Sequence, residues 1–365
     1  MSRPTAAIID LQALRHNYGL AESLAPNSQT IPMVKANAYG HGAIEVATAL
    51  AAMAPAFGVA CIEEAIALRD ANISQPILLL EGTFTADEVT QAEHHNLWLM
   101  VENQPQLDAI LAADLSHQIK AWLGVDTGMH RLGFQPEDLA AAYSALKASR
   151  NVHDEIVVTS HFACADDLNN SATSQQIATF DNSLPRDSAQ AMPITSLANS
   201  AAILAWPEAQ RDWQRPGYML YGNSPFAEPQ ANADQLQPVM SFESAVISVR
   251  EIPAGDSVGY SANWTAQRQS HIATVAVGYG DGYPRHAPNG TPVLVNGVKC
   301  PLVGRVSMDM ITVDVTDLVN TRVKIGDRVI LWGPALPVNE VAAACNTIGY
   351  ELLTRMPDRV PRIYR

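Results

Sequence analysis

A single lysine stands where a short apolar run gives way to a loop that contains glycine. Lys35 follows the apolar residues 31–34 and is followed by Tyr39, Gly40 and Gly42. Only a neutral amine attacks an aldehyde, and partial burial lowers the pKa of a lysine because it disfavours the ammonium form. Lys35 therefore suits covalent attachment of an aldehyde cofactor. The alternative is a lysine that ends a strand in solvent.

Composition limits the classes of function. The chain has 365 residues, of which 47% are hydrophobic and 16% are charged, and such a chain usually folds into two domains around large cores. Its formal net charge of −14 would repel a phosphate backbone, which argues against nucleic-acid binding. The opening apolar run is too short for a secretory signal, and no segment approaches the ~20 apolar residues of a membrane span. We therefore expect a cytoplasmic protein.

The four cysteines are far apart and show no metal-ligand spacing. They stand at Cys61, Cys164, Cys300 and Cys345. We expect reduced thiols, with neither a disulfide framework nor a metal site.

The first two thirds of the chain alternate apolar runs with alanine-rich amphipathic stretches, a pattern typical of repeated strand–helix units. The expected strands are 31–34, 57–60, 77–80, 97–101, 119–125, 156–160, 193–197 and 217–221. The expected helices include 43–54, 63–71, 85–94, 105–113 and 136–148. This pattern predicts an α/β fold with a closed (β/α)8 barrel of the TIM type. An open doubly wound sheet is the alternative, but no GxGxxG motif follows the first strand.

A polar, proline-containing segment at 224–238 indicates a linker. Beyond it, short runs rich in Val, Ile and Thr alternate with turns, which predicts a smaller, mainly antiparallel β domain. We expect the barrel at 10–228 and the β domain at 229–365. The opening run Ala6–Ile9 fits a strand of either domain, and residues 1–9 could join the β domain.

Polar residues follow several of the expected strands, at the end of a barrel where function usually lies. Taken singly, each has a simpler explanation. Asp126 and Thr127 could form a turn, His161 could be a core histidine, and Arg215 could be a surface cation. Asn199-Ser200 could cap a helix. Because all of them gather at one predicted rim together with Lys35, we favour a functional site.

These residues belong to longer motifs that resemble the alanine racemases, pyridoxal-phosphate enzymes of the racemase/decarboxylase barrel group. The resemblance spans nearly the whole chain. The matching segments are that of Lys35, Val125–Gly133, Ser160–Ala163, Arg215–Gly222, Val258–Tyr260, Gly278–Tyr283 and Ser307–Asp309. The Val-Lys-Ala-Asn core alone is less specific, because related barrel decarboxylases carry something similar.

The resemblance implies pyridoxal phosphate attached to Lys35 and interconversion of L-alanine and D-alanine by two bases. Lys35 would move the α-proton on one face of the substrate, and Tyr260 from the β domain of a partner chain would act on the other. Each site of a homodimer would then need both chains. The resemblance further implies that His161 bonds to the Tyr260 phenol, and that Arg215 bonds to His161 and to the pyridine nitrogen of the cofactor.

The resemblance also supplies a binding set. The implied cofactor-binding residues are Lys35, Tyr39, His161, Asn199, Ser200, Arg215, Gly217, Tyr218 and Tyr350. Arg131 is the expected partner of the substrate carboxylate, since a planar guanidinium matches it. Met308 and Tyr279 would approach the substrate from the partner chain. Asp166, Arg285 and Arg305 would line a polar entrance.

One position departs from the family pattern. Many members carry a lysine, modified to a carbamate, two residues before the Asp-Thr-Gly motif, and this chain has Gly124 there. We expect chloride or a similar small anion in the space near Gly124 and Arg131.

Three other functions remain open at this point. A racemase of broader range that includes serine is one, because pockets reject an added hydroxyl weakly. A barrel amino-acid decarboxylase dependent on pyridoxal phosphate is another, although those enzymes use a catalytic cysteine in a context that Cys300 and Cys345 lack. A pyridoxal-phosphate carrier would need only the barrel. Supply of D-alanine for peptidoglycan and alanine catabolism are both compatible with the sequence.

Overall fold

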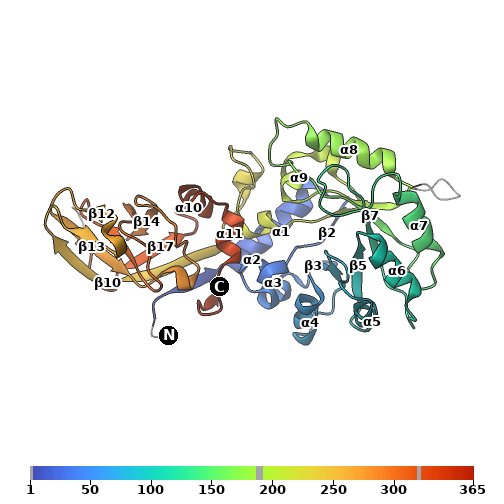
Figure 1. The fold of residues 1–365 in the computed structure, drawn as a ribbon, viewed down its shortest axis with the longest axis horizontal. Coiled ribbons are helices and arrows are strands. Elements are labelled where there is room, and N and C mark those ends of the chain that lie inside the picture. Colours follow the sequence, from blue (N-terminus) through green and yellow to red (C-terminus); the bar gives the residue numbers. More distant parts are fainter. Residues whose placement is uncertain (1–2, 186–191, 319–321) are drawn as a thin grey trace.

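The chain forms a barrel and a β domain that lie end to end along the long axis of the molecule (Figure 1). The computed structural model describes residues 3–185, 192–318 and 322–365. A polar connection over residues 223–239 joins the two parts. It is held to the barrel by Asn17, whose side-chain amide donates to the Gln237 carbonyl at 2.8 Å.

Eight parallel strands form the barrel and pair in the order β2-β9-β8-β7-β6-β5-β4-β3. A parallel bridge between Met33 and Gly58 closes the ring between the first and last of these strands. The TIM-type barrel predicted from the sequence is thereby confirmed. The strands are β2 (Gln29–Thr30), β3 (Phe57–Val59), β4 (Ile77–Leu79), β5 (Leu97–Val101), β6 (Ala121–Gly124), β7 (Val157–Thr159), β8 (Ile194–Ser196) and β9 (Trp213–Gln214).

Helices surround this ring, and local sequence explains where several of them begin. Asp10 caps the first helix, because its Oδ1 accepts hydrogen bonds from two backbone N–H groups. Asn103 caps another in the same way, with a proline in the first turn. All five helices named from the sequence are present; three are shorter than expected, and the helices expected at 63–71 and 105–113 begin and end one residue earlier. The helices of this part are α1 (Leu11–Leu24), α2 (Lys35–Tyr39), α3 (Ala43–Leu50), α4 (Ile62–Asp70), α5 (Asp87–His94), α6 (Gln104–Ala112), α7 (Leu139–Ala148), α8 (Ala172–Ser183) and α9 (Ser200–Ala205).

The barrel interior is apolar in its lower part and polar toward the C-terminal ends of the strands. Met100, Trp122, Val157 and Trp213 belong to one buried cluster inside the ring. Side chains two residues apart on a strand point to the same face, so the next layer is formed by the residues two positions further on. That layer contains Glu102, Gly124, Thr159 and Arg215, all of which line the cavity above it.

The mainly antiparallel β domain predicted from the sequence is confirmed, and it is built around the long strand β10. β1 pairs with β10 in antiparallel fashion and with β18 in parallel fashion, so the opening run belongs to this sheet. Its strands are β1 (Ala6–Ile9), β10 (Met240–Ile252), β13 (Ser270–Val275), β14 (Pro292–Val295), β15 (Val298–Pro301), β16 (Ile311–Asp314), β17 (Arg328–Trp332) and β18 (Arg362–Tyr364). Two helices, α10 (Val338–Ala344) and α11 (Gly349–Thr354), lie on its barrel side (Figure 1).

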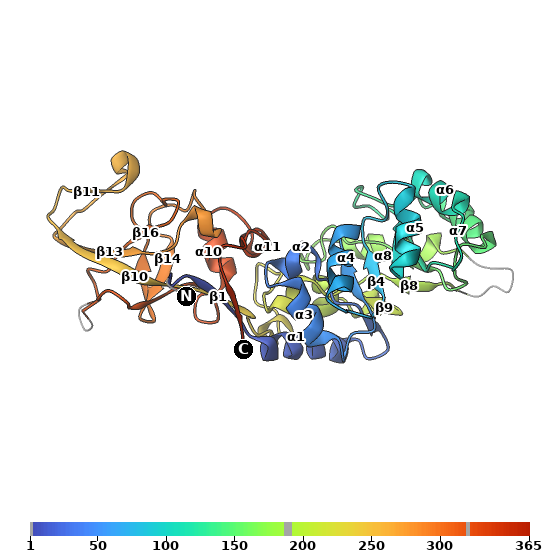
Figure 2. The same cartoon turned by 90° about the horizontal axis from the view of Figure 1, so that it is seen from below.

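A separate two-stranded ribbon projects from the end of the β domain farthest from the barrel (Figure 2). It consists of β11 (Ser257–Val258) and β12 (Trp264–Thr265), joined by a short 3-10 turn at Tyr260–Ala262. Any side chain on this turn is therefore remote from the barrel of its own chain.

Two of the predicted barrel strands are wrong in position. The predicted strand 217–221 is a 3-10 turn over Tyr218–Tyr221, and the last strand lies earlier, at Trp213–Gln214. A short apolar run that is buried on all sides does not distinguish a strand from a helix by period alone. The first strand is Gln29–Thr30, and residues 31–34 contribute only the bridge at Met33.

Candidate active site

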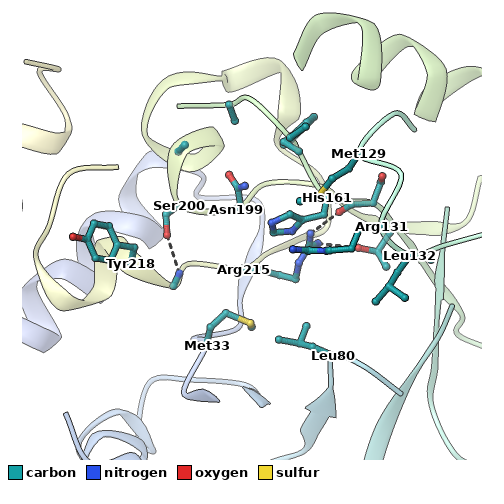
Figure 3. Close-up of a pocket in the computed structure, with 18 of the residues that line it drawn as sticks. Met33, Leu80, Met129, Arg131, Leu132, His161, Asn199, Ser200, Arg215 and Tyr218 are labelled. Carbon is teal, nitrogen blue, oxygen red and sulfur yellow. Dashed lines mark hydrogen bonds between the residues drawn. The ribbon is translucent and has the colours of Figure 1, made fainter. Parts of the chain in front are cut away.

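A cavity of about 700 Å³ opens at the C-terminal ends of the barrel strands. Figure 3 shows its lining, with Arg131, His161 and Arg215 gathered on one side and Ser200 and Tyr218 on another. Helix α11 of the β domain contributes Tyr350 to the wall. Ten residues singled out from the sequence line this one cavity, namely Lys35, Tyr39, Arg131, His161, Asn199, Ser200, Arg215, Gly217, Tyr218 and Tyr350.

Lys35 begins a short turn of left-handed helix. Ala36, Asn37, Ala38 and Tyr39 have φ between 51° and 53°, a region that L-residues with a side chain rarely adopt. Glu64 stabilises the start of this turn, because its Oε1 accepts from the Ala36 N–H at 2.7 Å. The sequence predicts only a glycine-containing loop here, since none of these residue types requires a positive φ.

The surroundings of Lys35 favour a neutral amine. Its pKa is lowered, first by burial and then by the nearby Arg131 guanidinium, while Glu81 and Glu64 act in the opposite direction. Burial also raises the pKa of Tyr39 to about 12, so that its hydroxyl remains a hydrogen-bond donor near neutral pH. A neutral amine is the state that attack on an aldehyde requires.

Backbone N–H groups and hydroxyls converge on the opposite side of the cavity. Ser200 Oγ accepts from the N–H of Gly217 at 2.9 Å and from that of Met219 at 3.2 Å. A Cβ on Gly217 would lie 2.6 Å from the Tyr39 hydroxyl oxygen, so the glycine is needed for this close approach. Donors of this kind in one place suit a phosphate.

Two tyrosines close this end of the cavity. The rings of Tyr218 and Tyr350 stack with centroids 3.6 Å apart, and the Tyr218 hydroxyl donates to Asn339 Oδ1 at 2.6 Å. Burial raises the pKa of both phenols. Asn199 caps α9 by accepting from the Ala202 N–H at 3.1 Å, and it also lines the cavity.

Arg215 lies on the floor of the cavity and is 4% exposed, so it is not a surface cation. Its guanidinium donates to Thr159 Oγ1 at 2.9 Å, to the Ser160 carbonyl at 2.6 Å and to the Leu197 carbonyl at 3.2 Å, and it also bonds to Ser196. Four neutral acceptors therefore hold the charge in place. Burial lowers its pKa to about 10, which leaves it protonated near neutrality.

His161 is exposed to the cavity, and three cationic side chains act on its ring. Loss of hydration, followed by the charges of Arg215, Arg131 and Lys35, lowers its pKa to about 3. The ring is therefore neutral across the physiological range. The hydrogen bond between His161 and Arg215 that the resemblance implies stays a prediction.

Asp126 shapes the turn that presents Arg131. Its Oδ1 accepts from the N–H groups of Gly128 at 2.9 Å and of His130 at 3.0 Å, and His130 adopts φ 55°. Burial alone would raise the pKa of Asp126, but these bonds and the His130 ring lower it overall. The simple reading of Asp126 as a turn former is thereby confirmed.

The space beside Gly124 is taken by a carboxyl group that the sequence analysis did not single out. A Cβ built on Gly124 would lie only 1.9 Å from Glu102 Oε2. Glu102 is 9% exposed, and burial raises its pKa to about 7 although Arg215 and Arg131 oppose the shift. The available signal was the two-residue strand period, which places position 102 on the same inward face as Met100.

Three residues expected near the substrate lie outside the cavity. Tyr260, Met308 and Tyr279 are 70%, 53% and 40% exposed. Tyr260 stands on the projecting ribbon, remote from the barrel (Figure 2). Tyr279 and Met308 lie on adjoining loops of the β domain, since the N–H of the next residue, Gly280, bonds to the Met308 carbonyl at 2.8 Å.

A buried carboxylate fixes these adjoining loops. Asp281 is fully buried, accepts from the Gly278 N–H at 2.9 Å and pairs with Arg3 and Arg359. Arg359 also pairs with Asp309, next to Met308. These ion pairs and the hydrogen bond therefore hold the loops that carry Tyr279 and Met308 in place.

The expected entrance residues lie apart in the single chain. Asp166 lines the main cavity, whereas Arg285 lines a smaller hollow of about 260 Å³ together with Tyr279. Arg305 is half-buried in the β domain. In the described ranges, no group of three or more His, Cys, Asp or Glu side chains could hold a metal ion.

Comparison with known proteins shows the family to which this chain belongs. The family model for the N-terminal domain of alanine racemase matches residues 9–225, and that for the C-terminal domain matches residues 239–364. The chain belongs to the alanine racemase family. The biosynthetic alanine racemase of Pseudomonas aeruginosa is 51% identical over 362 residues, which is 99% of this chain and 99% of that protein.

Solved structures of alanine racemases share the whole fold. The crystal structure of the biosynthetic alanine racemase from Pseudomonas aeruginosa superimposes with a TM-score of 0.94 at 50% identity and covers 100% of this chain and 99% of that one. The alanine racemase from Bartonella henselae, solved with covalently bound pyridoxal phosphate, has a TM-score of 0.88 at 32% identity, with 99% of each chain covered. Among the residues described here, we find no helix with the length and apolar character of a membrane span.

Proposed function

We propose that this chain uses pyridoxal phosphate to interconvert L-alanine and D-alanine, and that two bases from different subunits move the proton. Membership of the alanine racemase family supports the reaction. The distribution of the two bases supports the mechanism, because Lys35 lines the cavity while Tyr260 stands exposed on a ribbon remote from it. The comparisons do not favour a decarboxylase.

The residues of the cavity fit pyridoxal phosphate. Ser200 Oγ, the bare backbone at Gly217 and the Tyr39 hydroxyl would hold the phosphate, and Lys35 Nζ would hold the aldehyde carbon. Arg215 would face the ring nitrogen as a fixed cation, which disfavours protonation of that nitrogen. When bound, the cofactor makes the α-proton of an attached amino acid acidic enough to remove.

The chain's own groups then have separate tasks. Lys35 Nζ takes or returns the α-proton on its side, for which the lowered pKa of the amine is suitable. Arg131 binds the substrate carboxylate. His161 stays neutral and accepts or donates a hydrogen bond without adding a further positive charge.

The second base has to come from another copy of the chain. The Tyr260 Oη is proposed to take or return the proton on the face opposite Lys35, with Met308 and Tyr279 of the same β domain beside the substrate. A homodimer with composite sites satisfies this requirement, because the ribbon is too remote to reach the cavity of its own barrel (Figure 2). Isologous pairing makes the two sites equivalent.

A subunit-mixing experiment tests this arrangement. Lys35→Ala and Tyr260→Phe homodimers are each expected to be inactive, and mixed dimers contain one site with both native bases. Under conditions of proven subunit exchange, up to about half of the dimers are mixed and each has one native site of two, so up to about a quarter of the wild-type activity should return. Exchange measured with labelled subunits, but without recovery of activity, would falsify the shared site.

Some finer expectations remain part of this proposal. We keep the domain boundary at 228/229 and the cytoplasmic location as proposals. The small anion expected near Gly124 and Arg131 is an alternative to the Glu102 carboxyl, which lies in the same space. Alanine is proposed as the main substrate because Tyr350 and the partner subunit's Tyr279 would narrow the pocket. Turnover of serine, measured by chiral analysis of the products, tests the wider substrate range. Supply of D-alanine for peptidoglycan and alanine catabolism require the same chemistry.

A further inference from the structure

The room beside Gly124 exists because this position has no side chain. Gly124 ends β6, and Glu102 follows β5, the neighbouring parallel strand. The strand register pairs Val101 with Leu123, so one further step sets Glu102 beside Gly124. Any Cβ at position 124 would overlap the carboxyl of Glu102, with 1.9 Å to Oε2 and 2.7 Å to Cδ.

The backbone around Glu102 directs its side chain toward the inside of the barrel. The Glu102 N–H donates to Gln106 Oε1 at 2.8 Å, and Asn103 caps the helix that begins directly afterwards. The side chain therefore continues the inward face of β5 and reaches the cavity floor, where Glu102 is 9% exposed. A carboxyl that is this well buried costs stability unless a cation or hydrogen bonds compensate for it.

Two guanidinium groups act on this carboxyl, and they differ in the bonds they already make. Arg215 bonds to Thr159, Ser196, Ser160 and Leu197. Arg131, by contrast, is exposed to the cavity on a turn held by Asp126. In the part of the chain that the structure describes, Glu102 influences Arg131 electrostatically without a close ion pair. Arg131 thus has the freedom to be directed, and above its pKa of about 7 the ionised Glu102 has the charge to direct it.

We propose that Glu102, in the room left by Gly124, is the positioning residue that directs the Arg131 guanidinium toward the substrate carboxylate. This inference rests on the proposed role of Arg131. A built-in carboxylate then provides the negative charge that a diffusible chloride would otherwise supply. The two assignments exclude each other, because a small anion and an ionised carboxylate in the same space would repel.

Steady-state kinetics with L-alanine and D-alanine test the inference. Glu102→Gln keeps the shape and removes the charge, so KM should rise about ten-fold while kcat changes little, as expected for a lost charge-assisted interaction. Glu102→Asp should recover part of the affinity. Gly124→Ala should give the same rise in KM, because its Cβ displaces the carboxyl. Glu137→Gln is the control, since it removes an exposed carboxylate that does not line the cavity and should leave KM within about two-fold.

A double-mutant cycle separates a direct effect from a structural one. Arg131→Ala should raise KM, and adding Glu102→Gln to it should have no further effect. If Arg131→Ala alone leaves KM unchanged, the proposed role of Arg131 fails and the inference fails with it. If Arg131→Ala raises KM while Glu102→Gln does not, or if the two effects simply add, only the inference about Glu102 is overturned.

Crystals soaked in bromide give a readout that is independent of activity. We expect carboxylate density beside Gly124 and no anomalous peak there in the wild-type protein. A bromide peak between Gly124 and Arg131 in wild-type crystals would overturn the assignment and support the diffusible anion instead.

Discussion

Gly217→Ala is the sharpest test of the phosphate end of the cavity. The new Cβ would lie 2.6 Å from the Tyr39 hydroxyl oxygen, whereas ordinary contact begins at 3.4 Å, so this hydroxyl must retreat by about 0.8 Å. The Tyr39 ring stacks on Tyr221 at 4.9 Å and lies 6.3 Å from Tyr350, which leaves it little room to swing aside. The substitution therefore moves the hydroxyl away from its place beside Gly217.

The expected magnitude follows from the bonds that are lost. A hydrogen bond to a charged group contributes about 1.5–3 kcal/mol, so loss of the Tyr39 contact alone should raise the Kd for pyridoxal phosphate about 10- to 100-fold. The assay is titration of the apoenzyme with cofactor, followed by absorbance or intrinsic fluorescence. Gly19→Ala is the control, because a Cβ there meets nothing within 4 Å.

The clash can also be removed from the other side. Tyr39→Phe deletes the oxygen that a Cβ at position 217 would meet, so Gly217→Ala should cost much less affinity in the Tyr39→Phe background than in the wild type. If Gly217→Ala leaves the Kd unchanged, or weakens binding equally in both backgrounds, the close approach of Tyr39 to Gly217 does not explain the glycine.

Three further outcomes are expected. Lys35→Ala should abolish both racemisation and the absorbance of covalently attached cofactor, and retention of either would contradict its role. Glu64→Ala leaves the N–H groups of Ala36 and Ala60 without their acceptor, so the free energy of unfolding should fall by about 1–3 kcal/mol in chemical denaturation. Burial raises the pKa of Glu102 from 4.5 to about 7, although Arg215 and Arg131 oppose the shift. Between these pH values the folded protein holds a proton that the unfolded chain has released, so the free energy of unfolding of the wild type falls as the pH rises. Glu102→Gln should remove up to about 3 kcal/mol of that loss, and parallel Tm curves for both proteins from pH 5 to pH 8 would contradict this.

The barrel and most of the cavity wall could be predicted because both depend on local patterns. Alternating apolar runs and amphipathic helices determine the barrel, and strand ends determine where Lys35, Arg131, His161 and Arg215 meet. The run at Tyr218–Tyr221 was misassigned because it is buried on every side and so carries no period.

The strand period places Glu102 on the inward face, but its contact with position 124 could not be found from local sequence alone. Its position depends on a neighbour 22 residues further along the chain, Gly124, and neither residue has a distinctive motif. The absence of a side chain at position 124 was visible, but what fills the space depends on strand register and packing. The sequence therefore indicated an open position and assigned it to a diffusible ion, whereas the structure brings a carboxyl there.

The left-handed turn after Lys35 has a consequence for how the amine is held. Each non-glycine residue in this conformation costs about 1–2 kcal/mol, and glycine would remove most of that cost. The chain nevertheless has alanine, asparagine, alanine and tyrosine at positions 36–39. A residue with a Cβ restricts the neighbouring backbone torsion angles more than glycine does. The turn is therefore locally less stable but more rigid than a glycine-containing turn would be. The rigid backbone after Lys35 therefore limits the lysine amine to a narrow set of orientations.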